Sequence, residues 1–200
     1  MQPADNILVE RSKNGDMEAF EQLVRRYENK VYTVAYRFLG NHADASDLAQ
    51  DAFLRLYHAL PSFRGESSFM TWLYRITANA CRDEIRRRQR YHFMSLDNEI
   101  ENNGDHIMSR VSGLTPSPEE EFEQKEFNDM IQQCINSLTP EHRLILVMRE
   151  IQGLSYDEMA DVLKCSLGTV KSRLSRARQA FKEIFNDRRE LWSKDSRLAK

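Results

Sequence analysis

The spacing of apolar residues predicts helices along most of the chain. From Asp16 to Gly40, apolar residues recur every three or four positions, which is the period of one buried helical face. Asp16 is a suitable N-terminal cap and Gly40 a natural stop. Similar patterns predict helices over residues 44–60 and 68–90, so residues 1–90 are expected to form one compact helical domain.

The helical period is lost over residues 91–116, where asparagine and glycine are frequent, and this stretch is predicted to be a flexible linker. Beyond it, capping boxes at 117–120 and 155–158 and a Thr-Pro pair at 139–140 predict new helix starts.

The last predicted helix is long. Ser166 is expected to cap it, and its apolar period ends near Phe185. Residues 186–200 are then expected to be a frayed basic tail. The predicted fold is all-α, with small helical domains at 1–90 and 117–185.

Charge is unevenly distributed along the chain. The net charge is only -2, but residues 61–92 hold seven basic and three acidic residues, and residues 166–200 hold ten basic and four acidic ones. Between them, residues 93–130 hold two basic and ten acidic residues. Two basic blocks indicate two surfaces for a polyanion, although each block alone is also typical of a solvated helix face.

Composition excludes several classes of protein. The three cysteines are widely spaced, which excludes a disulfide scaffold and favours the reducing cytoplasm. No apolar run approaches the ~18 residues of a membrane helix, so no stable membrane insertion is expected. The histidines are scattered and no phosphate-binding glycine loop is present, so we expect no metal, no cofactor and no enzymatic activity.

Residues 155–185 predict a helix-turn-helix. A short helix opened by a capping box precedes a tight turn at Cys165-Ser166 and a long basic helix. Lys164 occupies a turn position where glycine is common.

One side of the final helix is apolar and the other is polar. Arginine and lysine pair with guanine edges or phosphates in a duplex groove, and serine contacts either. A basic surface helix of an ordinary bundle is the alternative. The polar side and its flanks consist of Lys171, Ser172, Arg173, Ser175, Arg176 and Arg178.

On the helix predicted over residues 68–90, polar and aromatic side chains form one stripe. Aromatic rings stack on unpaired bases and guanidinium groups hold the backbone, so the stripe is typical of a surface for single strands. Taken alone, its tryptophan is more often a core residue, and the arginine run 86–88 more often a solvated helix end. The stripe consists of Trp72, Arg75, Asn79, Arg82 and Arg86, and the preceding loop adds Phe63, Arg64 and Gly65.

Three motifs in one chain resemble a bacterial sigma factor of the extracytoplasmic-function class, in the sigma-70 family. They are DLAQDAF at 47–53, TWLYRI at 71–76 and GTVKSR at 168–173. The resemblance covers nearly all of residues 16–185 apart from the linker, and it implies family region 2 at 1–90 and region 4 at 117–185.

The resemblance implies a dissociable sigma subunit that directs promoter recognition, strand opening and transcription initiation. In the family, the helix that holds Asp47, Gln50 and Asp51 docks on the clamp helices of the RNA polymerase β′ subunit. The loop and stripe would capture a flipped-out base and the opened strand at the minus-10 element. Region 4 would read the minus-35 duplex through the polar side of its last helix and Thr169, assisted by Arg149.

The resemblance also implies partners. These are core RNA polymerase, through the β′ clamp helices and the β flap, promoter DNA, and an anti-sigma factor. Because such anti-sigma factors are often membrane-anchored, the chain is expected in the bacterial cytoplasm or held at the membrane by that partner.

A stand-alone helix-turn-helix regulator with a dimerising N-terminal bundle is the alternative function. It explains residues 166–185 and leaves the stripe unexplained. Such a regulator binds a palindromic duplex by itself, whereas a sigma factor binds promoters weakly until core polymerase is present.

Overall fold

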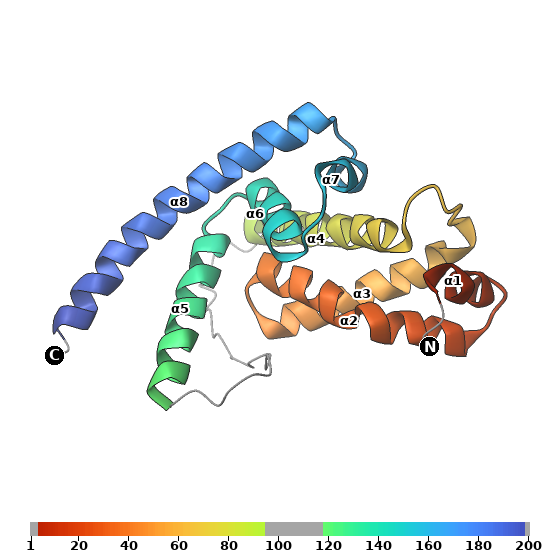
Figure 1. The fold of residues 1–200 in the computed structure, drawn as a ribbon, viewed down its shortest axis with the longest axis horizontal. Helices are drawn as coiled ribbons and strands as arrows, with labels where there is room; N and C mark the ends of the chain where they lie inside the picture. Colours follow the sequence, from red (N-terminus) through yellow and green to blue (C-terminus); the bar gives the residue numbers. More distant parts are fainter. Residues whose placement is uncertain (1–3, 95–117, 199–200) are drawn as a thin grey trace.

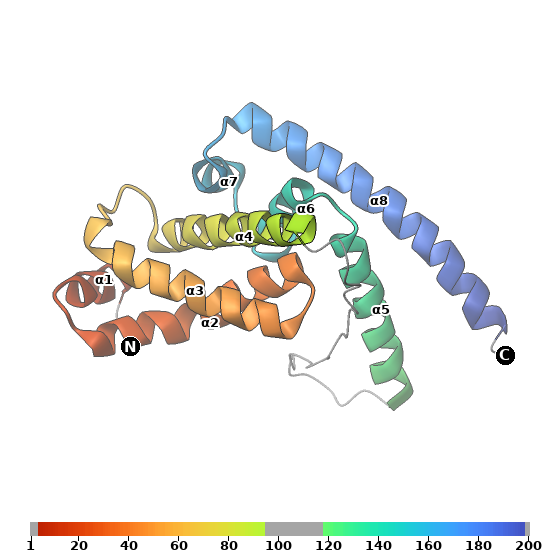
Figure 2. The ribbon, with the colours of Figure 1, turned by 180° about the vertical axis from the view of Figure 1, so that it is seen from behind.

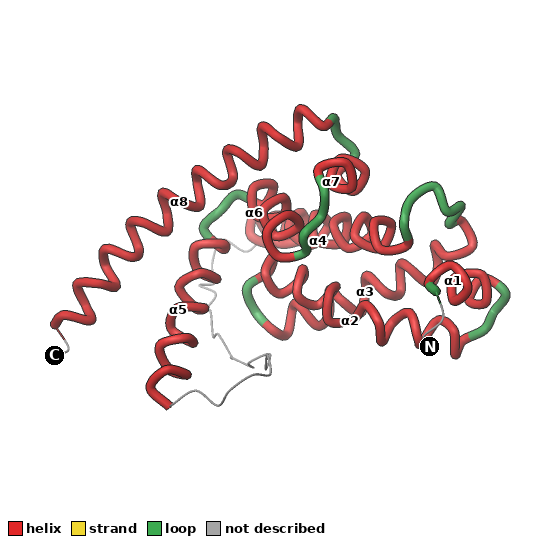
Figure 3. The backbone as a smooth tube through the Cα atoms, viewed as in Figure 1, coloured by secondary structure: helices red, strands yellow, loops and turns green. Residues whose placement is uncertain are grey.

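The computed structural model describes residues 4–94 and 118–198, and their regular structure is helical, without strands (Figures 1 and 3). We call residues 4–94 the N-terminal lobe and residues 118–198 the C-terminal lobe. The N-terminal lobe holds α1 (Asp5–Lys13), α2 (Met17–Leu39), α3 (His42–Ala59), the 3-10 turn η1 (Leu60–Ser62) and α4 (Phe69–Met94). The C-terminal lobe holds α5 (Pro118–Asn136), α6 (Pro140–Leu146), the π-helical turn η2 (Val147–Ile151), α7 (Tyr156–Leu163) and α8 (Leu167–Leu198).

The expected limits of the first long helix are confirmed. The Asp16 carboxylate accepts from the Ala19 N–H at 3.0 Å, and Gly40 ends α2 with a φ of 85°. The next helix starts earlier than expected, because the Asn41 side chain caps α3 by accepting from the Asp44 N–H at 2.9 Å.

Helix α1 was not predicted. Its apolar residues are consecutive rather than periodic, and its N-cap residue, Ala4, makes no side-chain cap. Tertiary contacts hold it instead: Leu8 and Val9 are fully buried, and Asp5 accepts a hydrogen bond from Arg26 at 2.5 Å.

The predicted frayed tail is wrong for residues 186–198, because α8 continues to Leu198. In the first of the extra turns, Arg188 donates to Gln133 Oε1 of α5 at 2.6 Å. Helix α4 likewise runs to Met94, past the predicted start of the linker. The rest of the linker and the capping residue Ser117 lie outside the described residues.

Two hydrophobic cores hold the molecule together. One lies within the N-terminal lobe, among α1, α2, α3 and the start of α4. The other contains buried residues of both lobes. Helices α6 and α7 lie beside α4 in both views (Figures 1 and 2). The sequence predicts the two domains but not their packing against each other.

Candidate nucleic-acid interface

The loop between η1 and α4 and the first turns of α4 form a hollow of about 300 Å³. Ser68 caps α4 by accepting from the Thr71 N–H at 3.0 Å, and Gly65 takes a φ of 74° at the loop tip. A residue with a Cβ is strained at that φ, so glycine suits this turn. The lining residues are Ser62, Phe63, Arg64, Glu66, Ser67, Trp72 and Arg75.

The structure places Trp72 in the wall of this hollow and largely inside the core. Its side chain is only 6% exposed, and its ring lies 4.7 Å from that of Phe63 and 6.2 Å from that of Phe69. Trp72 is therefore a core residue, as considered from the sequence, and it also lines the hollow.

The rest of the predicted stripe continues along α4. Arg75 and Arg82 are half-buried, and Asn79 and Arg86 are exposed. Asn79 Oδ1 accepts from Arg82 Nη1 at 3.0 Å, which fixes the guanidinium on the stripe. The basic stripe thus begins at the aromatic hollow, which Arg75 lines, and follows the same helix.

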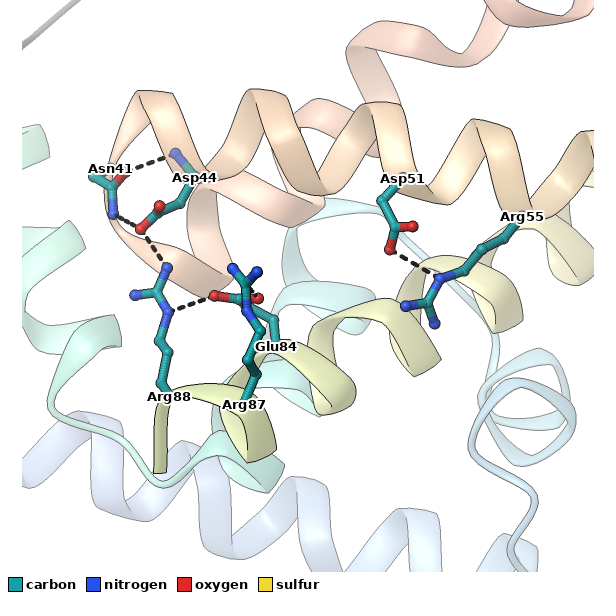
Figure 4. Close-up of polar contacts among 7 residues, drawn as sticks. All are labelled: Asn41, Asp44, Asp51, Arg55, Glu84, Arg87 and Arg88. Carbon is teal, nitrogen blue, oxygen red and sulfur yellow. Dashed lines mark hydrogen bonds and ion pairs between the residues drawn. The ribbon is translucent and has the colours of Figure 1, made fainter. Parts of the chain in front are cut away.

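In the arginine run at the end of α4, Arg88 is half-buried and Arg86 and Arg87 are exposed. Figure 4 shows the contacts of Arg87 and Arg88. Arg88 joins α4 to α3, donating to Glu84 at 2.8 Å and to Asp44. Arg87 also pairs with Glu84, at 2.8 Å. Arg86 is 71% exposed and pairs only loosely with Asp83, at 3.7 Å, so it belongs to the surface.

The carboxyl groups of Asp44 and Glu84 have pKa values below their ordinary ones. Burial alone would raise the pKa of Asp44 and of Glu84, but hydrogen bonds outweigh it. Asn41 and Arg88 lower the pKa of Asp44, and Arg88 and Arg87 lower that of Glu84. Both carboxylates therefore stay charged and keep the end of α4 attached to α3.

The C-terminal lobe contains the predicted helix-turn-helix. Ser155 and Glu158 form a complete capping box, with reciprocal bonds of 3.2 and 2.8 Å. Lys164 ends α7 with a φ of 55°, the left-handed conformation expected of a turn glycine. Ser166 caps α8 by accepting from the Thr169 N–H at 3.1 Å.

Helix α8 presents the two sides that were predicted. Val170, Leu174 and Ala177 are buried. The exposed residues of the predicted duplex surface are Lys171, Ser172, Ser175, Arg176 and Arg178, and Thr169 and Arg173 are half-buried.

The flanks of α8 face different neighbours. Lys171, Ser175 and Arg178 line a hollow of about 400 Å³ beside Tyr156. Arg178 donates to Glu150 at 2.6 and 2.9 Å, which raises its pKa. Arg173 is on the other flank and lines a hollow against α4.

Arg149, expected to assist at the duplex, is engaged within its own lobe. Its Nη1 donates to the Leu154 carbonyl at 2.6 Å, and its guanidinium lies 5.1 Å from the centre of the Tyr156 ring. It thereby fixes the turn that precedes α7.

The predicted polymerase-docking residues lie on α3. Asp47 and Gln50 are exposed, whereas Asp51 pairs with Arg55 at 2.8 Å (Figure 4). Arg55 also reaches Asp83 on α4, at 2.6 Å. Asp51 thus belongs to an ion-pair network that joins α3 to α4 through Arg55.

An apolar surface beside these residues was not predicted from the sequence. A hollow of about 690 Å³ lies between α2 and α3, and Gln50 is on its edge. Met17, Leu54 and Tyr57 line it and are 59%, 61% and 40% exposed. The signal was available, since Leu54 and Tyr57 lie off the buried face of their helix.

Within residues 4–94 and 118–198, no group of three or more His, Cys, Asp or Glu side chains is placed to hold a metal ion. No helix in these ranges has the length and apolarity to cross a membrane. The described cysteines are unpaired.

Comparisons with known proteins agree with this architecture. The family model described as Sigma-70 region 2 matches residues 23–91, and that described as Sigma-70, region 4 matches residues 128–181. The RNA polymerase sigma-H factor of Pseudomonas aeruginosa is 39% identical over 183 residues, covering 90% of this chain and 92% of the relative. The ECF RNA polymerase sigma-E factor of Escherichia coli K12 is 37% identical over 179 residues, covering 90% and 93%.

Two solved structures are similar over most of the chain. One is the sigma factor RpoE in complex with the anti-sigma factor NepR from Bartonella quintana, with a TM-score of 0.67, 25% identity and coverage of 84% of this chain and 96% of that one. The other is CnrH in complex with the cytosolic domain of CnrY, with a TM-score of 0.64, 27% identity and coverage of 92% and 99%.

Proposed function

The chain belongs to the sigma-70 family, as a sigma subunit of the extracytoplasmic-function class that directs transcription initiation, and we propose that its two lobes divide promoter recognition between them. One observation carries the proposal. The N-terminal lobe joins an aromatic hollow to a basic stripe, and the C-terminal lobe holds a helix-turn-helix with a polar outer side. The first suits unpaired bases and the second suits a duplex groove.

In the N-terminal lobe, we assign the hollow to a base flipped out of the minus-10 element. Phe63 offers a half-exposed ring for stacking, and Arg64 and Arg75 supply charge at its rim. Unstacking a base costs a few kcal/mol, which stacking and pocket contacts offset. Asn79, Arg82 and Arg86 then line the path of the opened strand.

In the C-terminal lobe, we assign the exposed side of α8 to the minus-35 duplex. Lys171, Ser172, Ser175 and Arg176 are the residues free to reach base edges and phosphates. Arg178 stays near the same side while paired with Glu150. The contact of Arg149 with Leu154 makes it a positioning residue in this proposal.

For docking on core polymerase, we propose a mixed surface on α3. Asp47 and Gln50 supply its polar part, and Leu54 and Tyr57 supply exposed apolar area beside them. Exposed apolar patches rimmed by polar groups are typical of protein interfaces. The proposed surface therefore combines apolar contacts with the polar residues that were expected from the sequence.

We further propose an anti-sigma factor as a regulatory partner, because one similar solved structure is of a sigma factor in complex with an anti-sigma factor. The chain would act in the bacterial cytoplasm, where polymerase meets chromosomal DNA, or be held at the membrane by that partner.

The family is one of transcription initiation factors, and we propose that this chain has no catalytic activity of its own. The stand-alone regulator is not favoured, because the sigma-factor relatives match both lobes.

The direct test is run-off transcription of fragmented genomic DNA from the source bacterium, with core RNA polymerase from that bacterium and the purified chain. We expect discrete transcripts that require both proteins. Tight binding of a palindromic duplex by the chain alone, without transcripts, would instead support the stand-alone regulator.

A further inference from the structure

We propose that the hollow between α4, α6 and α8 is a binding site for a diphosphate group, carried by inorganic pyrophosphate or by a nucleotide. The hollow has a volume of about 260 Å³, and residues of both lobes line it. Its ligand is a small anion, distinct from the promoter DNA and the protein partners proposed above.

Positive charge converges on this hollow. Arg82 and Arg86 lie one turn apart on the same face of α4, and Arg173 comes from α8. Gln89 continues the α4 side with an amide, and Glu141 of α6 supplies the one carboxylate among the described lining residues. Three arginines and one glutamate give the lining a formal net charge of +2.

The three arginines are incompletely neutralised by the protein itself. Arg86 and Arg173 approach a carboxylate only at 3.7 and 3.9 Å, whereas Arg178 reaches its partner at 2.6 Å. Arg82 donates to the neutral amide of Asn79. A guanidinium has five N–H donors, so each of the three retains donors for a ligand.

The floor of the hollow is apolar and belongs to the core. Phe38, Leu144 and Ile145 line it and are at most 2% exposed. The side chains of Arg86 and Glu141 are 71% and 73% exposed, so the charged groups face solvent. A low-dielectric wall strengthens the attraction between the guanidinium groups and a bound anion.

Size and charge together favour a diphosphate. At ~30 Å³ for each water molecule, the hollow holds about nine waters, which is the space of a pyrophosphate ion rather than of a whole nucleotide. Guanidinium groups bind phosphate oxygens in bidentate pairs, and two linked phosphoryl groups offer enough oxygens for several arginines. A carboxylate ligand offers only two oxygens.

Occupancy of this site would also affect promoter binding. Arg82 and Arg86 are assigned to the opened strand, and Arg173 flanks the surface for the duplex. A bound diphosphate and bound promoter DNA would therefore compete for the same side chains. This consequence rests on the proposed function, whereas the binding of a diphosphate to the free protein does not.

The experiment is isothermal titration calorimetry of the free, full-length protein with sodium pyrophosphate, in magnesium-free buffer at about 0.15 M ionic strength. Gln89→Glu and Glu141→Gln change the charge of the hollow in opposite directions, at exposed residues assigned to neither DNA nor polymerase. We expect Gln89→Glu to weaken binding by about tenfold and Glu141→Gln to strengthen it by up to about tenfold, because each alters one charge beside the ligand.

Two variants on α5 are matched controls. Gln124→Glu and Glu126→Gln make the same charge changes at exposed positions away from the hollow, and they should bind pyrophosphate as the wild type does. Equal shifts in these controls would show that pyrophosphate senses only the net charge, and would overturn the site. So would the absence of binding by the wild type at up to about 1 mM pyrophosphate.

Orthophosphate and ADP distinguish the source of the diphosphate. Orthophosphate should bind at least about tenfold more weakly than pyrophosphate, because it lacks the second phosphoryl group, and equal affinity would overturn the assignment. ADP that binds at least as tightly as pyrophosphate, with the same response to Gln89→Glu, would identify a nucleotide as the ligand. Weaker binding of ADP would identify the inorganic ion.

Competition with DNA has a separate readout. Pyrophosphate should displace a fluorescein-labelled single strand, taken from a promoter located by run-off transcription, at concentrations near its calorimetric Kd. A strand that stays bound at saturating pyrophosphate would overturn the competition. Failure of the proposed function would appear differently, as absent run-off product with pyrophosphate binding and its variant shifts intact.

Discussion

At the scale of single residues, the three consecutive arginines at the end of α4 have different roles. Residues 86–88 form one basic run in the sequence, which is equally typical of a strand-binding surface and of a solvated helix end. The structure separates them by partner: Arg88 reaches across to Asp44 on α3, while Arg86 extends into solvent. Sequence spacing identifies the run, but only the packing of α3 on α4 assigns its members.

This division predicts different effects for alanine substitutions in the run. Arg88→Ala should lower the free energy of unfolding by about 1–2 kcal/mol, because Asp44 and Glu84 lose a shared donor. Arg86→Ala should change stability by less than about 0.5 kcal/mol, since it is a surface substitution, and should instead weaken promoter opening. Urea denaturation and abortive transcription measure the two effects.

The pH dependence of the same pair checks the mechanism. The pKa values of Asp44 and Glu84 are lowered in the folded protein, so their stabilisation is present above about pH 4 and is lost as the pH falls through the lowered values. The stability difference between wild type and Arg88→Ala should therefore shrink below about pH 4. A difference that stays constant down to pH 3 would contradict the ion-pair explanation.

At the scale of elements, caps and periodicity predict most helices, and tertiary contacts determine the rest. The capping box at Ser155 and the limits of α2 follow from local chemistry. Helix α1 and the continuation of α8 past Phe185 do not. Asp5 pairs with Arg26 in the first case, and Arg188 bonds Gln133 in the second. Such long-range pairs carry no periodic signal in the sequence.

The turn of the helix-turn-helix offers a stabilising substitution. Lys164 has a φ of 55°, a conformation that glycine adopts without the steric cost of a Cβ. Lys164→Gly should raise the free energy of unfolding by about 0.5–1 kcal/mol, as measured by thermal or urea denaturation. Ser155→Ala, which removes the cap at the other end of α7, should lower it by about 1 kcal/mol. A destabilising Lys164→Gly would show that the lysine side chain itself is needed at the turn.

The proposed polymerase-docking surface on α3 is best tested by a variant that keeps the ion pairs of this helix intact. Reversing the charge of Asp51 would break its ion pair with Arg55. Loss of polymerase binding by that variant could then come from a disturbed fold or from a lost contact with polymerase. Leu54→Glu is cleaner, because Leu54 is 61% exposed and its replacement leaves the core intact. We expect unchanged thermal stability and at least about tenfold weaker binding to core polymerase, measured by fluorescence anisotropy, because a charge is placed in an apolar interface. Glu21→Ala, an exposed change on α2, is the control, and normal binding by Leu54→Glu would remove α3 from the interface.

At the scale of the whole molecule, the arrangement of the lobes was the least predictable feature. The sequence indicates two domains through the lost helical period and the charge pattern. It carries no signal for the bond between Tyr74 and Gln152 or for the cap of α2 by Arg143, because these pairs are 78 and 105 residues apart. Trp72 shows the same limit, since its place in both core and hollow depends on the packing of Phe63 and Phe69.

Substitutions can distinguish the two proposed nucleic-acid surfaces. Trp72→Ala is unsuitable, because removing a buried aromatic side chain costs about 3–5 kcal/mol of stability. Asn79→Ala changes an exposed residue, and it should leave closed-complex formation intact while slowing strand opening. A pre-melted bubble template should restore much of this loss, because it removes the cost of unpairing.

Lys171→Ala/Arg176→Ala should instead weaken initial binding by about 1–3 kcal/mol for each lost base contact, and the bubble should not restore it. Permanganate footprinting of unpaired thymines, with holoenzyme on duplex and bubble promoters, distinguishes these results. Rescue of Lys171→Ala/Arg176→Ala by the bubble, with loss of duplex binding in Asn79→Ala, would require the two assignments to be exchanged.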